Sequence, residues 1–349
     1  MTELIAERAR LAIVEHTRRL AESAVAAGPY AAVPTAPEWT VRDLVEHVGQ
    51  TQHWVAEIIE RRITDPTQLP TEMAVPPSDP GDWQTWLAES AQRVADACSD
   101  DALVDAPVFN AAGDDRSGTQ FWLTSMLNEA VVHGYDAANA ANAVNAATAE
   151  NAANAANAAN AASAPNAANA ASAVNAATAA NAANAANAAN AATAASGGGA
   201  AGASGLVGVA GAAGVIRASD AGGRSVGTDV DGDVAAALIT NHLAMLTSPT
   251  WEMRRTESAH AIRGTGQTLQ WIATDTTGDE GAWFVERRPD GATWQPGTHQ
   301  ADVTITGPAG SLLLTMTRRL SLTDATGITI TGDTDLIDHW LDNTAHVAG

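Results

Sequence analysis

The stretch "SGTQFWLTSMLNEAVVHGYDAA", residues 117–138, decides the fold that we expect for this chain. Within it, Trp122, Met126, Glu129, His133 and Asp136 follow one another at spacings of four, three, four and three residues. Residues at these spacings share one face of an α-helix. The stretch therefore predicts a helix whose face begins aromatic and apolar, and ends with a carboxylate, an imidazole and a second carboxylate.

Three further segments have the same helical period. The segment "WTVRDLVEHVGQTQHWVAEIIERRI", residues 39–63, begins with Thr40 as N-cap and Asp43 three residues later, a variant of the capping box. The other two helices are expected over residues 2–27 and in "DWQTWLAESAQRVADAC", residues 82–98. Four helices joined by mostly polar connections favour an antiparallel four-helix bundle.

Three side chains of this bundle form a candidate metal site. Glu129 and His133 lie one helical turn apart, so an oxygen and a nitrogen can reach a common point about 2 Å from each, as zinc requires. His47 lies on the apolar-leaning face of its helix and offers a third ligand if the two helices face each other. Two histidines and a glutamate leave one coordination position open, as in catalytic zinc sites. Asp136, one turn beyond His133, is a candidate either to orient the metal ligands from behind or to accept a hydrogen bond from a substrate.

The same residues also suit a structural interpretation. A Glu-x-x-x-His pair is frequent by chance, and Glu129 and His133 are also ordinary partners on one helix face. A single histidine on an apolar face, such as His47, is more often a hydrogen-bonded core residue. Spacing alone leaves both interpretations open.

A three-residue repeat follows the bundle. From Asn139 to Gly214, every third residue is Asn, Thr, Ser or Gly. In an α-helix each triplet advances by about 300°, so the polar positions wind around the axis and leave no apolar stripe. Alanine nevertheless favours helix. We expect residues 139–228 to form a low-complexity insert, disordered or partly helical, without chemistry of its own.

The remaining residues, 229–349, predict a small α+β domain. A helix is expected over residues 233–246, followed by strand-like segments with β-branched alternation. "GPAGSLLLTM", residues 307–316, reads as a helix opening, and "TGD", residues 331–333, turns into a final helix. The fold class is thus a four-helix bundle, residues 1–138, separated from an α+β domain by the insert.

Composition narrows the classes of partner. The formal net charge of −22 argues against nucleic acid and anionic membranes, which need clustered cations. A single cysteine, Cys98, excludes an internal disulfide and fits a reducing compartment. The N-terminal segment is charged throughout, which argues against a signal peptide, and no apolar run is long enough to span a bilayer. We expect a soluble, cytoplasmic protein.

Two of these stretches resemble a known family. "PEWTVRDLVEHVGQTQHWVAEII", from Pro37, and "GTQFWLTSMLNEAVVHGYDA", from Gly118, are similar to the signature stretches of the mycothiol-dependent maleylpyruvate isomerase family, whose N-terminal domain is a DinB-like four-helix bundle. The resemblance implies that His47, Glu129 and His133 bind a divalent metal, usually zinc. Asp136 matches the aspartate of the family's HxxDA ending, whereas Gly134 stands where members often have arginine.

The C-terminal part is similar to the smaller second domain of the same family. The arginine that has been linked to catalysis there corresponds to Arg319, with Arg318 in the place of a glycine. The resemblance implies mycothiol as thiol cosubstrate. It also implies a zinc-activated thiolate that adds to an electrophilic small molecule, in cis–trans isomerisation or S-transfer, with Arg319 holding a substrate carboxylate. A non-catalytic metal- or ligand-binding protein and a metal-dependent hydrolase on the same scaffold are the alternatives.

Overall fold

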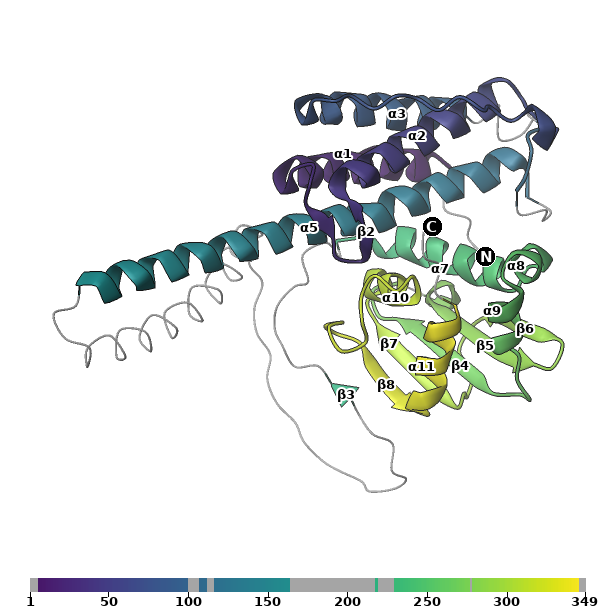
Figure 1. Cartoon of the computed structure of the whole chain (residues 1–349). Coiled ribbons are helices and arrows are strands. Elements are labelled where there is room, and N and C mark those ends of the chain that lie inside the picture. The colour runs from purple at the N-terminus through teal and green to yellow at the C-terminus, as the bar shows by residue number, and fades with distance from the viewer. Residues whose placement is uncertain are drawn as a thin grey trace. The chain divides into compact units, whose positions relative to one another are not determined.

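The computed structural model describes residues 6–99, 107–111, 116–163, 217–218, 229–276 and 278–344. Contacts divide the chain into two compact units. The first comprises Met1–Ala141, Gly214–Asp220 and Ser225–Gly349, and the second comprises Asn142–Ala213 and Ala221–Arg224. The expected fold class, a helical bundle followed by an α+β region, is confirmed (Figure 1). The bundle and the α+β region share one unit, while the expected domain boundaries at residues 138 and 228 stay a prediction.

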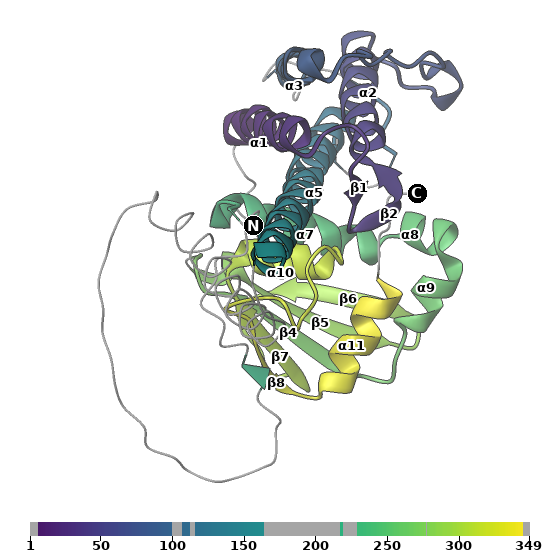
Figure 2. The same ribbon diagram turned by 60° about the vertical axis from the view of Figure 1, so that its left-hand side comes forward.

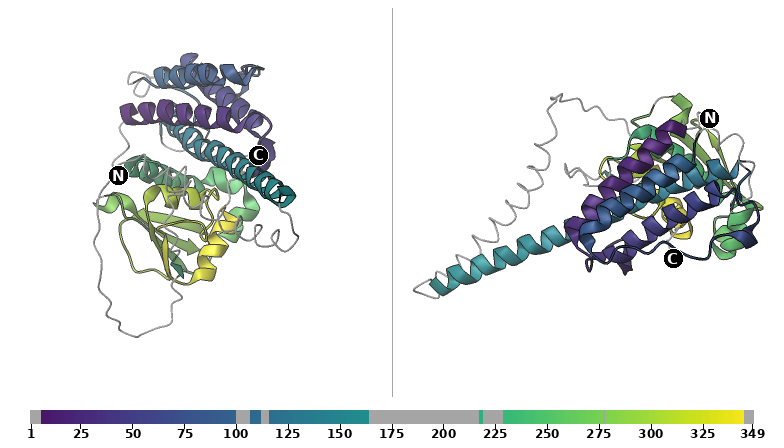
Figure 3. Two further views of the ribbon diagram at one scale, coloured as in Figure 1. Left: turned by 90° about the vertical axis from the view of Figure 1, so that its left-hand side faces the viewer. Right: turned by 90° about the horizontal axis from the view of Figure 1, so that it is seen from above.

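Long helices form the N-terminal part. They are α1 (Ala6–Ala27), α2 (Val41–Glu60), α3 (Trp83–Ala97) and α5 (Gly118–Ser163). Two short 3₁₀ helices, η1 (Pro66–Gln68) and η2 (Pro80–Asp82), lie between α2 and α3. Figures 1 and 3 show α1, α2 and α3 packed together beside the first part of α5. The helical periodicity of the sequence thus correctly located the four long helices that the structure describes here.

The bundle core contains one buried polar chain that joins three helices. Gln52 on α2 donates to the hydroxyl of Thr17 on α1 at 2.8 Å, and accepts from the hydroxyl of Ser90 on α3 at 2.7 Å. All three side chains are fully buried. A buried polar group without a partner is costly, so these bonds favour a single relative placement of α1, α2 and α3.

A β-hairpin connects α1 to α2. Its strands are β1 (Ala32–Val33) and β2 (Ala36–Thr40), which pair antiparallel, and its turn holds Pro34 and Thr35. Figure 2 shows this hairpin beside α5. The sequence pattern did not predict this hairpin, because strands this short have no alternation to detect. Thr40 ends β2 and caps α2, where the expected capping box with Asp43 is present in full.

The C-terminal part is built on a six-stranded sheet in the order β3-β8-β7-β4-β5-β6. Strand β4 is parallel to β7, and the other neighbours are antiparallel. The strands are β3 (Arg217–Ala218), β4 (Thr268–Ala273), β5 (Ala282–Arg288), β6 (Gly291–Pro296), β7 (Val303–Gly307) and β8 (Thr329–Gly332). Leu269 and Trp271 lie two residues apart on β4, share one face of the sheet and are fully buried. Gln270 between them is fully buried as well, so both faces of this strand are covered.

Helices cover this sheet and join it to the bundle. They are α7 (Gly232–Leu246), α8 (Pro249–Arg254), α9 (Thr256–Ala261), α10 (Ala309–Met316) and α11 (Thr334–Asn343), with the 3₁₀ helix η3 (Gly278–Gly281) before β5. Figures 1 and 2 show α7 and α10 between the first part of α5 and the sheet. One continuous apolar core includes Leu127 of α5, Leu238 of α7 and Leu313 of α10. The end of α10 is thereby brought to α5.

The triplet repeat begins inside a helix. Helix α5 continues past Asn139 to Ser163, so the start of the insert is helical, in line with the expected partial helicity. Residues 164–216 and 219–228 lie outside the described residues, and the interpretation of that part stays a prediction. Among the helices that the structure describes, none is long and apolar enough to cross a membrane.

Candidate metal centre

The structure brings His47, Glu129 and His133 together. The Nε2 atom of His47 on α2 lies 3.1 Å from Oε2 of Glu129, and Nε2 of His133 lies 3.1 Å from the same oxygen. One ligand atom from each side chain lies within 4.8 Å of those of the other two. His133 is buried, whereas the side chains of His47 and Glu129 are 34% and 28% exposed. The cluster is therefore open on one side and closed on the other.

The helices place these residues by periodicity and packing. Leu44, one turn before His47 on α2, and Ala130, one turn before His133 on α5, are fully buried. These apolar neighbours turn the two helices toward the bundle interior, and the polar side chains follow them on the same faces. The sequence predicted that the face of α5 ends in polar residues, and only the packing of α2 against α5 adds His47 to them.

Behind His133 lies a buried carboxylate. The Nδ1 atom of His133 is 2.9 Å from Oδ2 of Asp136, whose side chain is 1% exposed. Asp136 also accepts a hydrogen bond of 2.6 Å from the Thr35 hydroxyl. The guanidinium of Arg319, just after α10, donates to both carboxylate oxygens, at 3.4 Å from Nε and 3.3 Å from Nη2. Three parts of the chain thus converge on Asp136.

This arrangement shifts the pKa values of the buried groups. Burial alone lowers the pKa of His133, but its hydrogen bonds to Asp136 and Glu129 outweigh burial and raise that pKa to about 9. Burial raises the pKa of Glu129, but its hydrogen bonds with His133 and His47 hold that pKa far below its ordinary value. Burial also raises the pKa of Asp136, but the hydrogen bond with His133 and the charge of Arg319 outweigh burial and lower that pKa. The site therefore holds two carboxylates that stay ionised, and it favours positive charge between them.

The donor set suits a divalent ion of the zinc type. Two imidazole nitrogens and one carboxylate oxygen are the ligands of a catalytic zinc site. Ligands 2.1 Å from a tetrahedral ion lie about 3.4 Å apart, close to the two separations of 3.1 Å in this cluster. When an ion replaces the proton on Nε2 of His133, Asp136 keeps the remaining proton on Nδ1, so that the Nε2 lone pair binds the ion.

The N-terminal part also matches a known family. Residues 10–138 match the family described as "Mycothiol maleylpyruvate isomerase N-terminal domain". This part of the chain belongs to that domain family. The match contains α2, the hairpin and the stretch of α5 that carries Glu129 and His133, so the expected family is confirmed for the bundle. Neither the curated proteins nor the solved structures gave a match to the chain.

The maleylpyruvate isomerase N-terminal domain of this chain includes two site residues that sequence reasoning missed. Thr35 reaches Asp136 from the hairpin turn, and Trp39 of β2 lies against both histidines, with ring centroids 5.0 Å from His47 and 5.9 Å from His133. Trp39 lies inside the stretch that resembles the family, and its position just before the N-cap was the available signal. A Cβ at Gly134 would lie 3.7 Å from the backbone carbonyl of His16 on α1, which is an ordinary contact distance.

The structure distinguishes the two adjacent arginines. Arg319 has a side chain only 8% exposed and faces Asp136, while Arg318 is exposed and pairs with Asp342 at 3.0 Å. Arg318 adopts φ 64°, the left-handed conformation that favours glycine, which explains why a glycine stands there in the family pattern. The carboxylate that Arg319 holds in this structure is Asp136. The expected catalytic role of Arg319 stays a prediction.

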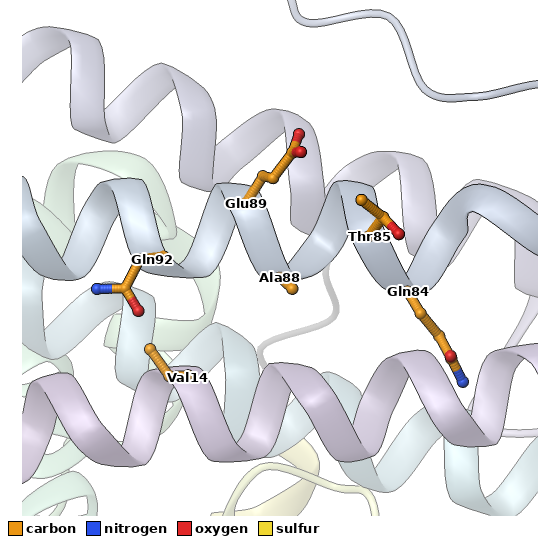
Figure 4. A pocket seen from close by; sticks show the side chains of 6 residues that line it. All are labelled: Val14, Gln84, Thr85, Ala88, Glu89 and Gln92. Atoms are coloured by element: carbon orange, nitrogen blue, oxygen red, sulfur yellow. The ribbon is translucent and has the colours of Figure 1, made fainter.

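Two other features lie outside this site. Cys98, at the end of α3, is fully buried, and burial raises the pKa of its thiol to about 12. Figure 4 shows an open groove between α1 and α3, lined by Val14, Ala88 and polar side chains of α3 such as Gln92. None of the groove residues belongs to the cluster around His133. The groove therefore adds nothing to the candidate metal centre.

Proposed function

We propose that this protein binds a divalent metal ion, preferably zinc, through His47, Glu129 and His133, and uses it with mycothiol to act on an electrophilic small molecule. The observation that carries the proposal is the convergence of these three ligand atoms inside a domain of the mycothiol maleylpyruvate isomerase family. An ion held there lowers the pKa of a thiol bound to it, so that a thiolate is available at neutral pH.

The charges of the site support an anionic ligand at the open position. Glu129 and Asp136 are both held ionised, and Arg319 compensates one of them. A divalent ion adds two positive charges, which leaves the site with one in excess when both histidines are neutral. A thiolate removes that excess, whereas a neutral ligand does not. The partial exposure of Glu129 and His47 gives such a ligand a way in.

The protein itself does not supply the thiol in this proposal. Cys98 is the single cysteine, it is fully buried in the core, and its raised pKa keeps it protonated. The nucleophile therefore has to come from a small molecule, which agrees with mycothiol as cosubstrate. The thiolate sulfur forms a bond to an activated alkene carbon while the π electrons move to the conjugated carbonyl.

Isomerisation and S-transfer differ only in the next step. In isomerisation, the substrate rotates about its new single bond, the electrons return, and the carbon–sulfur bond breaks to release the thiol unchanged. In S-transfer, the adduct takes up a proton and leaves. Arg319 is connected to the site through Asp136 and His133, which supports an enzyme over a protein that only binds metal.

The first experiment measures metal. The purified protein is expected to contain about one zinc per chain by elemental analysis, and Glu129→Ala to contain almost none after the same dialysis. Glu46→Ala is the matched control, because Glu46 is a carboxylate of α2 that bonds Gln50 instead of the histidines. Equal zinc contents in the parent and in Glu129→Ala would refute the site.

The second experiment distinguishes an isomerase or S-transferase from a hydrolase and from a protein that only binds metal. The zinc-loaded protein is incubated with mycothiol and maleylpyruvate, then with mycothiol and a bimane electrophile, and in each case without thiol. Thiol-dependent isomerisation or thiol-dependent bimane conjugation, lost in Glu129→Ala, supports the proposal. Ester hydrolysis without thiol indicates the hydrolase alternative, and zinc binding with no turnover indicates a metal-binding protein.

A further inference from the structure

One indole lies against both histidines of the candidate metal centre. The Trp39 ring is stacked on His133 with an interplanar angle of 23°, and tilted on His47 with an angle of 57°. The two imidazoles meet edge to face, with centroids 5.0 Å apart. Trp39, His47 and His133 therefore form a cluster of three rings in which each ring limits the rotation of the other two.

The two histidines are held in different ways. The ring of His133 is fixed by the bond from Nδ1 to Asp136. Among the described residues, Nδ1 of His47 has no such partner, and the ring contacts of His47 are with Trp39 and His133. Metal-ligating histidines almost always have a hydrogen-bond partner on the second nitrogen that fixes the ring plane. Besides His133, the described side chain that restrains the ring plane of His47 is the Trp39 indole.

The hairpin that carries Trp39 is anchored at both ends. At its turn, Thr35 donates to Asp136 of α5 at 2.6 Å. At its other end, Trp39 precedes Thr40, whose side chain and backbone complete the capping box of α2. The indole is consequently tied to both helices that supply the metal ligands, through the capping box of α2 and through the Thr35–Asp136 bond to α5. Its position is set by the same elements that set the cluster.

We propose that Trp39 is a positioning residue of the metal centre, whose indole holds the imidazole planes of His47 and His133 so that both Nε2 atoms face Glu129. This inference rests on the proposed function, because it takes these side chains to be metal ligands. It assigns Trp39 a role in the geometry and affinity of the site, through the rings and not through direct contact with substrate.

The chain offers a matched control on the same helix. His53 of α2 pairs with Trp86 of α3, with centroids 5.8 Å apart and an interplanar angle of 48°. This tryptophan–histidine pair lies outside the metal cluster. Changes at Trp86 test what the loss of an indole beside a histidine of α2 does to the protein in general.

The experiment titrates Co²⁺ into the metal-free full chain and records the visible bands and the dissociation constant. Trp39→Leu is expected to weaken Co²⁺ binding about 10-fold to 100-fold and to change the bands, while Trp39→Phe stays close to the parent. Trp86→Leu is expected to leave both readouts unchanged. Thermal unfolding of each metal-free variant shows whether it is folded. Parent-like affinity and bands in a folded Trp39→Leu protein would overturn the proposal.

A second readout is the quenching of tryptophan fluorescence by bound Co²⁺, measured in the phenylalanine variants. Bound Co²⁺ quenches the emission of a neighbouring indole, so Trp39→Phe is expected to lose most of the quenching that the parent shows, and Trp86→Phe to keep it. Full quenching in Trp39→Phe would also overturn the proposal. A parent that binds no Co²⁺ at all contradicts the metal site itself, and this result is distinct from a site that binds but does not depend on Trp39.

Discussion

Replacement of Asp136 by asparagine tests the network behind the metal centre most directly. The Asp136 carboxylate is almost fully buried and accepts hydrogen bonds from His133, Thr35 and Arg319. Asparagine keeps the size of the side chain but removes the charge, and it places an amide NH₂ where one oxygen accepts. The Arg319 guanidinium, 8% exposed, is then left buried without its anion.

The cost follows from the burial of this pair. Removal of one partner from a buried ion pair costs about 3–5 kcal/mol. The bonds from Arg319 to Asp136, at 3.3 and 3.4 Å, are longer than the 2.7–2.9 Å or so of a strong charge-assisted bond, so the lower end is expected. We expect Asp136→Asn to lower the free energy of unfolding by about 3 kcal/mol, and to weaken metal binding about 10-fold to 100-fold because His133 loses its orienting partner.

The assay is a double-mutant cycle in urea with a chelator present. Asp136→Asn, Arg319→Met and the double variant are compared, and the double variant is expected to lose about 1–3 kcal/mol less than the two single losses combined. Arg318→Met is the control for the arginine change, because its pairing with Asp342 is exposed and worth about 1 kcal/mol or less. Additive losses in the cycle, together with unchanged metal affinity of Asp136→Asn, would refute the reasoning.

Three further outcomes are expected. The pKa of His133 is raised from 6.5 to about 9, so its contribution to the stability of the metal-free protein is complete below pH 6.5 and is lost as pH rises through about 9. Chemical unfolding at several pH values should show this fall in the free energy of unfolding, and His133→Gln should lack it. Arg318→Gly should raise the free energy of unfolding by about 0.5–1 kcal/mol, since glycine adopts φ 64° without strain, whereas Arg318→Ala, which keeps a Cβ, should show no such gain. Cys98, buried and with its pKa raised to about 12, should react with an aromatic disulfide reagent only as fast as the protein unfolds; rapid labelling of the native protein would contradict this.

Much of the fold was predictable because it depends on local pattern. The helices of the bundle follow from apolar residues at helical spacing, and the start of α2 follows from Thr40 and Asp43. The strands β4 to β8 follow from alternation and turn residues. The hairpin β1–β2 was not predictable in this way, because strands of two and five residues that contain or adjoin proline carry too little pattern.

Some residues of the candidate site were likewise predictable from local pattern, and others were not. Periodicity placed Glu129, His133 and Asp136 on one helix face and His47 on the apolar-leaning face of another helix, and the family resemblance pointed to Arg319. The identity of the arginine beside Asp136, and the presence of Thr35 and Trp39, appear only in the folded chain. The contacts Arg319–Asp136, Thr35–Asp136 and Trp39–His133 join residues that are 183, 101 and 94 positions apart, so no local window contains them.

By itself, the sequence determined which residues share a face of each helix, where the helices begin, and which side chains have the chemistry to bind a metal. Only the tertiary structure decided that α2 faces α5, that the hairpin lies over both histidines, and that the end of α10 reaches Asp136. The physical reason is that periodicity is a property of one element. The choice of which faces meet is made by the burial of the shared apolar core and by the pairing of buried polar groups across it.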